Sequence, residues 1–180
     1  SIIVGGSGQF GVYLANELIK KKLHVIITTR NINNSKKKVN IKNKNIELIK
    51  LDVLKIKQIE KMINKYKPKS IFYLAGQSSP SLSFKKPKQT YLSNFIGCSN
   101  FLKTIKKQKN YCKFLNASSS EIFAKSMKKI NLNSKKRPIS PYGKAKLLSF
   151  NLTKKFRKKY SLNAYNAVLF NTESFLRGKN

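Results

Sequence analysis

The sequence predicts an α/β fold in which a doubly wound parallel sheet carries helices on both faces. Short apolar runs alternate with longer segments whose apolar residues recur at helical spacing. The short runs are almost continuously apolar, as in parallel strands that are buried on both sides. A glycine-rich turn, GGSGQFG (5–11), directly follows the first run. Together these features are typical of a Rossmann-like sheet.

The expected elements follow one another in regular alternation. Short β-branched or aromatic runs bounded by polar residues predict strands at 1–5, 24–29, 46–52, 70–76, 113–118 and 165–171. Helical spacing predicts helices at 10–22, 56–66, 90–108 and 142–160. The stretch 30–45 shows neither period, and we expect an exposed loop there. No linker divides the chain, so residues 1–180 are expected to form one domain.

The composition is dominated by positive charge. The formal net charge is +33, from 39 basic and six acidic residues, and only four of the basic residues are arginines. Arginine is the usual reader of bases and phosphates, and the lysines are spread along the whole chain. We therefore expect no specific nucleic-acid partner, although non-specific, salt-sensitive attraction to polyanions is expected.

Membrane, metal and disulfide chemistry are not indicated. No apolar run reaches the roughly 20 residues of a membrane-spanning helix. Cys98 and Cys112 lack metal-ligand spacing, which favours reduced thiols in the cytoplasm. His24 opens an apolar run and is expected to start a strand. No metal site is expected.

The glycine turn predicts a dinucleotide site. Gly5 allows a tight turn, Gly8 lets the backbone approach a diphosphate, and Gly11 lets helix and strand pack closely. The following helix offers free N–H groups to the phosphates. At the end of the second strand stands Arg30, with no acidic residue nearby. An arginine there accommodates a 2′-phosphate, so NADP is favoured over NAD.

Acidic residues are so scarce that their positions are informative. Asp52, Glu121 and Glu173 all lie at expected carboxyl ends of strands, where open α/β sheets bind ligands. Tyr142 and Lys146 stand four residues apart in a helix and so share one face. An ammonium group there would lower the pKa of the tyrosine, making it a usable acid or base. Ser119, at the end of the fifth strand, is placed to bond the same oxygen.

These residues resemble an established family. LAGQSSPSLSFKKP (74–87), NASSSEIF (116–123), SPYGKAKL (140–147) and LFNTESFLRG (169–178) are similar to segments of extended short-chain dehydrogenases/reductases, and more narrowly of GDP-mannose 4,6-dehydratases. The likeness runs through nearly all 180 residues, and the last segment is its most specific part. The Tyr/Lys pair is shared across the superfamily.

The resemblance implies a hydro-lyase that converts GDP-mannose to GDP-4-keto-6-deoxymannose, with internal hydride transfer through NADP. Ser119, Tyr142 and Lys146 would remove the proton of the C4 hydroxyl, and Glu121 would take the C5 proton as water leaves C6. A nucleotide-sugar epimerase or a 4-keto-6-deoxy-sugar reductase on the same fold is the alternative. The family also implies a homo-oligomer and a further, substrate-binding domain absent from this chain.

Binding residues carried over by position form two sets. The cofactor set is Gly5, Gly6, Ser7, Gly8, Gln9, Phe10, Gly11, Arg30, Asp52, Val53, Leu74, Ala75, Gly76, Gln77, Ser78, Lys146 and Arg177. The substrate set is Ser78, Ser119, Glu121, Tyr142, Asn171 and Glu173.

The chain also departs from the family. Ser119 replaces a threonine, Phe10 an aspartate, Thr172 a histidine, Gln89 an aromatic residue and Ala124 a glycine. The residues of the chemistry remain, while part of the binding shell differs. The chain begins inside a strand and stops early, so we expect a fragment truncated at both ends that binds cofactor but does not turn over substrate alone.

Overall fold

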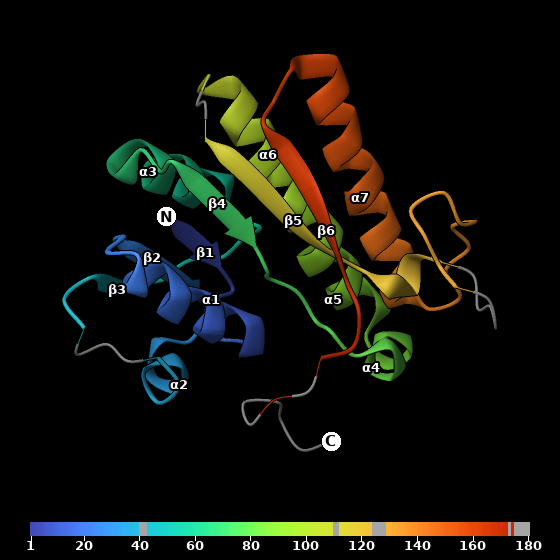
Figure 1. The fold of residues 1–180 in the computed structure, drawn as a ribbon, viewed down its shortest axis with the longest axis horizontal. Coiled ribbons are helices and arrows are strands. Elements are labelled where there is room, and N and C mark those ends of the chain that lie inside the picture. The colour runs from blue at the N-terminus through green and yellow to red at the C-terminus, as the bar shows by residue number, and fades with distance from the viewer. Residues whose placement is uncertain (40–42, 110–111, 124–128, 173, 175–180) are drawn as a thin grey trace.

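The fold is a single parallel sheet between layers of helices (Figure 1). We describe it from a computed structural model that covers residues 1–39, 43–109, 112–123, 129–172 and 174. The strands are β1 (Ile2–Val4), β2 (Val25–Thr29), β3 (Ile46–Lys50), β4 (Ser70–Tyr73), β5 (Lys113–Ser119) and β6 (Ala164–Leu169). Their order in the sheet is β3-β2-β1-β4-β5-β6, and every pair is parallel. This order reverses between β1 and β4, which creates the switch point where such sheets bind ligands.

Side-chain alternation along the strands divides the core in two. Ile2 and Val4 face helices α3 (Ile56–Tyr66), α6 (Gly97–Lys107) and α7 (Pro141–Tyr160). Ile3 faces the other way, onto α1 (Gln9–Lys20). Burial of both faces explains why β1 is an unbroken apolar run and why β2 begins with one. The predicted doubly wound α/β fold with helices on both faces is therefore confirmed.

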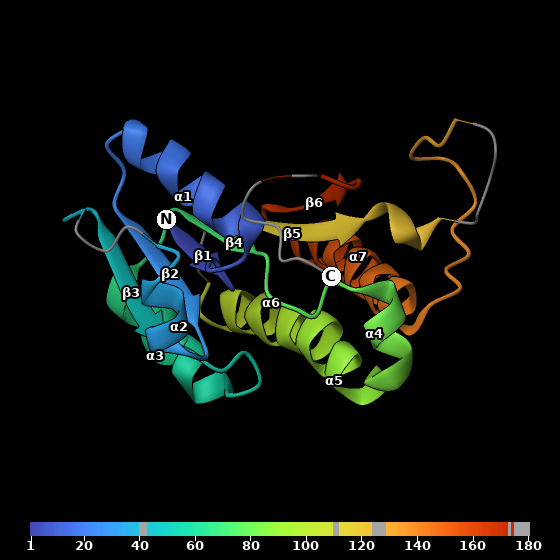
Figure 2. The same cartoon turned by 90° about the horizontal axis from the view of Figure 1, so that it is seen from below.

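Helix coverage is unequal on the two faces. Figure 2 shows α3, α6 and α7 beneath the sheet and α1 above β1 and β2. On the α1 side, no helix among the described residues lies over β5 and β6, and Tyr165 of β6 is 40% exposed there.

The stretch 30–45, expected to be a loop, contains the short helix α2 (Ile32–Lys36), so that expectation was wrong. Its start is set by a cap, because the side chain of Asn31 accepts a hydrogen bond from the backbone N–H of Asn34 at 3.1 Å. The Ser35 hydroxyl then donates to Thr29 Oγ1 at 2.7 Å and is buried. Polar caps form this turn, which no apolar period could reveal.

The helix expected at 90–108 is present, and it runs continuously through α5 (Pro87–Tyr91), a π-helical turn η1 (Leu92–Ile96) and α6. A shorter helix, α4 (Pro80–Lys85), precedes it. A proline occupies the first turn of both α4 and α5, where its missing N–H does no harm.

Among the described residues, no helix is long and apolar enough to cross a membrane.

Candidate active site

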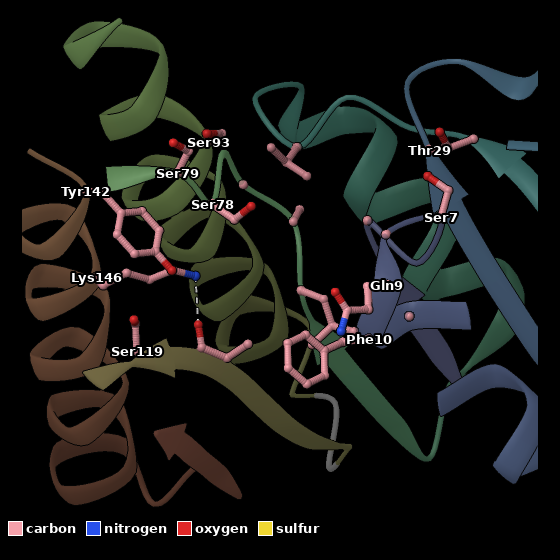
Figure 3. Close-up of a pocket in the computed structure, with 18 of the residues that line it drawn as sticks. Ser7, Gln9, Phe10, Thr29, Ser78, Ser79, Ser93, Ser119, Tyr142 and Lys146 are labelled. Carbon is pink, nitrogen blue, oxygen red and sulfur yellow. Dashed lines mark hydrogen bonds between the residues drawn. The ribbon is translucent and has the colours of Figure 1, made fainter. Parts of the chain in front are cut away.

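A cleft of about 970 Å³ lies along the carboxyl edge of the sheet. It runs from Ser7 and Thr29 at one end to Tyr142 and Lys146 at the other (Figure 3). It is bounded by the glycine turn after β1, the loops after β2, β3 and β4, the end of β5 and the start of α7. Residues as far apart in the sequence as Gly5 and Thr172 thus meet in one cavity because parallel strands end at the same edge.

The glycine turn has the structure that its spacing predicts. Gly5 has a φ of 74°, and a Cβ there would lie 2.6 Å from the Cα of Ala75, in the loop after β4. A Cβ on Gly11 would lie 2.3 Å from the Cα of Gly6, so only glycine lets α1 approach the turn this closely. The N-cap residue of α1, Gly8, provides no side-chain cap, which leaves the first N–H groups of the helix available to an anion.

Tyr142 and Lys146 are positioned by the first turns of α7. The Ser140 hydroxyl caps this helix by accepting from the N–H of Gly143 at 3.0 Å, and Pro141 occupies its first turn. Tyr142 and Lys146 both line the cleft, and the Lys146 Nζ lies 5.7 Å from the centre of the tyrosine ring. The expected shared helix face is therefore present.

Ser119 and Glu121 enter the cleft from the end of β5. The chain leaves the strand in a 3₁₀ turn, η2 (Ser120–Ile122), where the N–H of Glu121 donates to the Ser119 Oγ at 3.2 Å. Figure 3 shows the Ser119 and Tyr142 side chains facing each other. Ser119, Glu121, Tyr142 and Lys146 thus line one end of the cavity together.

The electrostatics of the pair differ from the sequence-based expectation. Burial raises the pKa of Tyr142, a hydrogen bond from Ser119 lowers it, and the nearby Glu121 charge raises it. The Lys146 ammonium donates to the backbone carbonyl of Ala117 at 2.8 Å instead of to the phenol. The prediction that Lys146 lowers the Tyr142 pKa is therefore wrong for this arrangement. Burial also lowers the pKa of Lys146 itself, to about 8.

The predicted binding residues fall into three groups. Those that line the cleft are Gly5, Ser7, Gly8, Gln9, Phe10, Gly11, Arg30, Asp52, Val53, Leu74, Ala75, Gly76, Ser78 and Asn171. Gly6 and Gln77 do not line it. Gly6 packs against the side chains of Ile3 and Ile27. The carbonyl of Gln77 accepts a hydrogen bond from Asn94 of η1. Glu173 and Arg177 lie outside the described residues.

Several lining residues were not foreseen from the sequence. Near Arg30 the cleft is also lined by Asn34, Ser35 and Lys38, all from the supposed loop 30–45. The run of three lysines at 36–38, in the same segment as Arg30, was the available signal for Lys38. Beyond the loop after β4, the wall includes Ser79 and Ser93, which Figure 3 places with Ser78 on the same side of Tyr142.

The departures from the family pattern also meet the cleft. The Phe10 ring lines it and is 41% exposed, and Thr172 and Gln89 line it as well. The Gln9 side-chain amide donates to the Thr172 carbonyl at 3.1 Å, which ties the segment after β6 to the start of α1. Ala124 lies outside the described residues. Among those residues, no group of His, Cys, Asp and Glu could hold a metal ion.

Comparison with known proteins gives a consistent result. Residues 2–180 match the family model described as GDP-mannose 4,6 dehydratase. The chain is 33% identical over 195 residues to the GDP-mannose 4,6 dehydratase of Cricetulus griseus, covering 100% of this chain and 52% of that protein. The Vibrio cholerae GDP-mannose 4,6-dehydratase is 28% identical, with 99% and 51% covered. The chain therefore spans about half the length of these curated relatives.

Solved structures of similar fold include nucleotide-sugar epimerases. The UDP-glucose 4-epimerase of Brucella ovis, in complex with NAD, superposes with a TM-score of 0.82 at 20% identity, covering 94% of this chain and 51% of that one. The UDP-Glc/GlcNAc 4-epimerase of Campylobacter jejuni gives 0.85 at 18%, covering 94% and 52%. At such identities the likeness establishes the fold alone.

Proposed function

Because the chain belongs to the GDP-mannose 4,6-dehydratase family, we propose that the protein carrying it is a hydro-lyase that converts GDP-mannose to GDP-4-keto-6-deoxymannose. One observation carries the proposal: Ser119, Glu121, Tyr142 and Lys146 line the same end of a cleft whose other end is a glycine turn. An alcohol oxidation needs the serine and tyrosine, and removal of a carbon-bound proton needs a separate base. Both are present within one cavity.

The cleft suits a dinucleotide, and we propose NADP. The glycine turn and the uncapped start of α1 match a diphosphate. Arg30 and Lys38 lie at the end near β2, where a ribose 2′-phosphate is recognised, and no acidic residue follows β2 directly. When bound there, NADP would supply a reversible hydride acceptor, which would let C4 be oxidised and C6 be reduced in one redox-neutral reaction.

The first proton transfer is assigned to Ser119 and Tyr142. Burial keeps the tyrosine a neutral phenol at rest, so its hydroxyl and that of Ser119 are both able to hold the C4 oxygen of the sugar. Taking the C4 proton requires a phenolate, which a positive charge beside the phenol would favour. The Lys146 ammonium is held by the Ala117 carbonyl, so we propose that it assists Tyr142 only after turning from that carbonyl towards the phenol.

The second proton transfer is assigned to Glu121. Once C4 is a ketone, the C5–H bond is acidic, and the carboxylate takes that proton and passes it to the hydroxyl group that leaves C6 as water. After hydride adds to C6, a proton from solvent adds to C5. A base at C5 distinguishes a dehydratase from a C4 epimerase or a simple reductase, which need none. Figure 3 shows the Ser119 and Tyr142 side chains facing the cleft, and Glu121 lines the same cavity two residues beyond Ser119.

The test is turnover of GDP-mannose by the full-length protein, with catalytic NADP in deuterated water. We expect a product that has lost one water and holds a single deuterium at C5, read by mass spectrometry. Glu121→Gln should bind NADPH as the unmodified protein does and lose turnover by roughly 10²–10⁴-fold. Unchanged GDP-mannose with intact NADPH binding would reject the substrate and favour an epimerase or a reductase.

Two expectations of the sequence stay proposals. Self-association through the long helices is implied by the family resemblance and is measured by light scattering. A cytoplasmic location agrees with the use of a nucleotide sugar and is checked by fractionation.

A further inference from the structure

The π-helical turn η1 forms a rigid contact with the loop that follows β4. A π turn inserts one extra residue into a helix, so a carbonyl near it loses its usual helical partner. Here the Ser93 carbonyl accepts a hydrogen bond from the Tyr73 hydroxyl at 2.7 Å. Tyr73 is the last residue of β4 and is fully buried, so this bond joins the end of the central strand to the turn.

Asn94, in the middle of η1, holds the loop itself. Its side chain is 1% exposed, and its Nδ2 donates to the Gln77 carbonyl and to the Thr90 carbonyl, both at 3.0 Å. The N–H of Gln77 points to the Ser93 Oγ at 3.4 Å. Both backbone polar groups of Gln77 therefore face the π turn, which explains why Gln77 lies behind the cleft and not in its wall.

The same contact fixes the neighbouring glycine. Gly76 has a φ of 143°, and a Cβ there would lie 2.3 Å from the Asn94 Oδ1. The loop backbone thus packs directly onto the amide. On its other side the loop meets the nucleotide turn, where the Cα of Ala75 approaches Gly5. The loop therefore contacts both Asn94 and Gly5.

The held loop forms one wall of the cleft. Leu74, Ala75, Gly76 and Ser78 line the cavity, while Asn94 itself does not. Building on the proposed function, we propose that Asn94 is a positioning residue that fixes the 74–79 loop in the conformation that binds the dinucleotide. Both donors of its amide are used, and its Oδ1 has no partner among the described residues. The hydrogen bonds that the Asn94 side chain makes are therefore those donated by its Nδ2, and its Oδ1 contributes none.

A charge-neutral amide is thus required, and Asn94→Asp tests this without changing the volume of the side chain. A carboxylate would face two carbonyl oxygens and repel them. Asn166→Asp is the matched control, since Asn166 Nδ2 also donates to a backbone carbonyl, that of Phe150 at 3.1 Å, away from the cleft. Tyr73→Phe is a milder second variant that removes only the bond to Ser93.

The measurements are the dissociation constant of NADPH or NADH, whichever the full-length protein binds more tightly, and the melting temperature. We expect Asn94→Asp, which loses two hydrogen bonds and gains repulsion, to weaken binding at least about 10-fold, and Tyr73→Phe, which loses one hydrogen bond, about 3-fold. Hydrogen exchange of the 74–79 peptide should rise in both variants. Asn166→Asp should lower the melting temperature with unchanged cofactor affinity.

The outcomes separate this inference from the proposed function. Wild-type affinity in both Asn94→Asp and Tyr73→Phe, with melting temperatures lowered as in the control, would reduce Asn94 to a structural role and overturn the inference. An unmodified protein that binds neither dinucleotide would overturn the inference and the cofactor assignment together. Tight dinucleotide binding that depends on Asn94, without dehydration of GDP-mannose, would reject only the substrate.

Discussion

Replacing Lys146 by methionine should stabilise the fold while removing activity. The ammonium is 6% exposed, and burial lowers its pKa from 10.5 to about 8. At about 1.36 kcal/mol per pKa unit, holding this charge inside the fold costs roughly 3 kcal/mol. Methionine has a similar size but gives up the hydrogen bond to the Ala117 carbonyl, worth about 1 kcal/mol. The expected net gain for Lys146→Met at pH 7 is therefore roughly 2 kcal/mol.

The pH dependence of this gain identifies its cause. Below about pH 8 the lysine is protonated in both the folded and the unfolded chain, and the full cost is present. Between about pH 8 and 10.5 the folded protein releases the proton while the unfolded chain keeps it. The unfolded state then binds more protons, so the stability of the unmodified protein rises with pH. The advantage of methionine should accordingly shrink across this window.

Thermal unfolding at pH 7 and at pH 9.5 measures the effect. At pH 7 a gain of this size raises the melting temperature of a protein of 150–250 residues by roughly 4–8 °C. At pH 9.5 most of that rise should be gone. Lys144→Met, on an exposed position of the same helix, is the matched control and should change neither value. A loss of stability in Lys146→Met at pH 7, or an equal gain at both pH values, would refute the argument from a buried charge.

Four further substitutions have expected outcomes. Tyr142→Phe should lower kcat by roughly 10²–10⁴-fold at unchanged NADPH affinity, because it removes the acid/base hydroxyl and keeps the ring; steady-state kinetics and fluorescence titration check this. Arg30→Ala and Lys38→Ala should each weaken NADPH binding by about 10-fold or more and leave NADH binding unchanged, since only a 2′-phosphate meets both side chains; calorimetry distinguishes the two cofactors. Ser140→Ala removes the cap of α7 and should lower the free energy of unfolding by about 1 kcal/mol in urea.

The strands and long helices could be predicted because their buried positions carry apolar residues at regular spacing in the sequence. β1 is apolar throughout, β2 begins with three apolar residues, and the Tyr142–Lys146 spacing directly gives a shared helix face. The helix α2 and the π turn η1 could not be predicted, because side-chain caps and one inserted residue determine them. Local hydrogen bonds of this kind have no periodic signature.

Residue roles within the site were harder to predict than its location. Gly6 and Gln77 belong to motifs that surround the cleft, yet one faces the core and the other is turned towards η1. A sequence motif predicts which segments surround a cleft, but the backbone conformation determines which residues of the segment line it. Likewise, the spacing of Tyr142 and Lys146 could not show that the ammonium would donate to the Ala117 carbonyl and not to the phenol.

The charge of the chain sets a condition on every binding experiment proposed for it. With a formal net charge of +33, any anion is attracted, including NADPH, NADH and GDP-mannose. Such general attraction is screened as the Debye length falls from about 8 Å at 0.15 M salt to about 3 Å at 1 M. Contacts of Arg30 and Lys38 with a 2′-phosphate within the cleft would be screened much less. A preference for NADPH over NADH therefore arises from the cleft if it persists at 1 M salt and disappears in Arg30→Ala. A preference that vanishes with salt arises from the surface lysines.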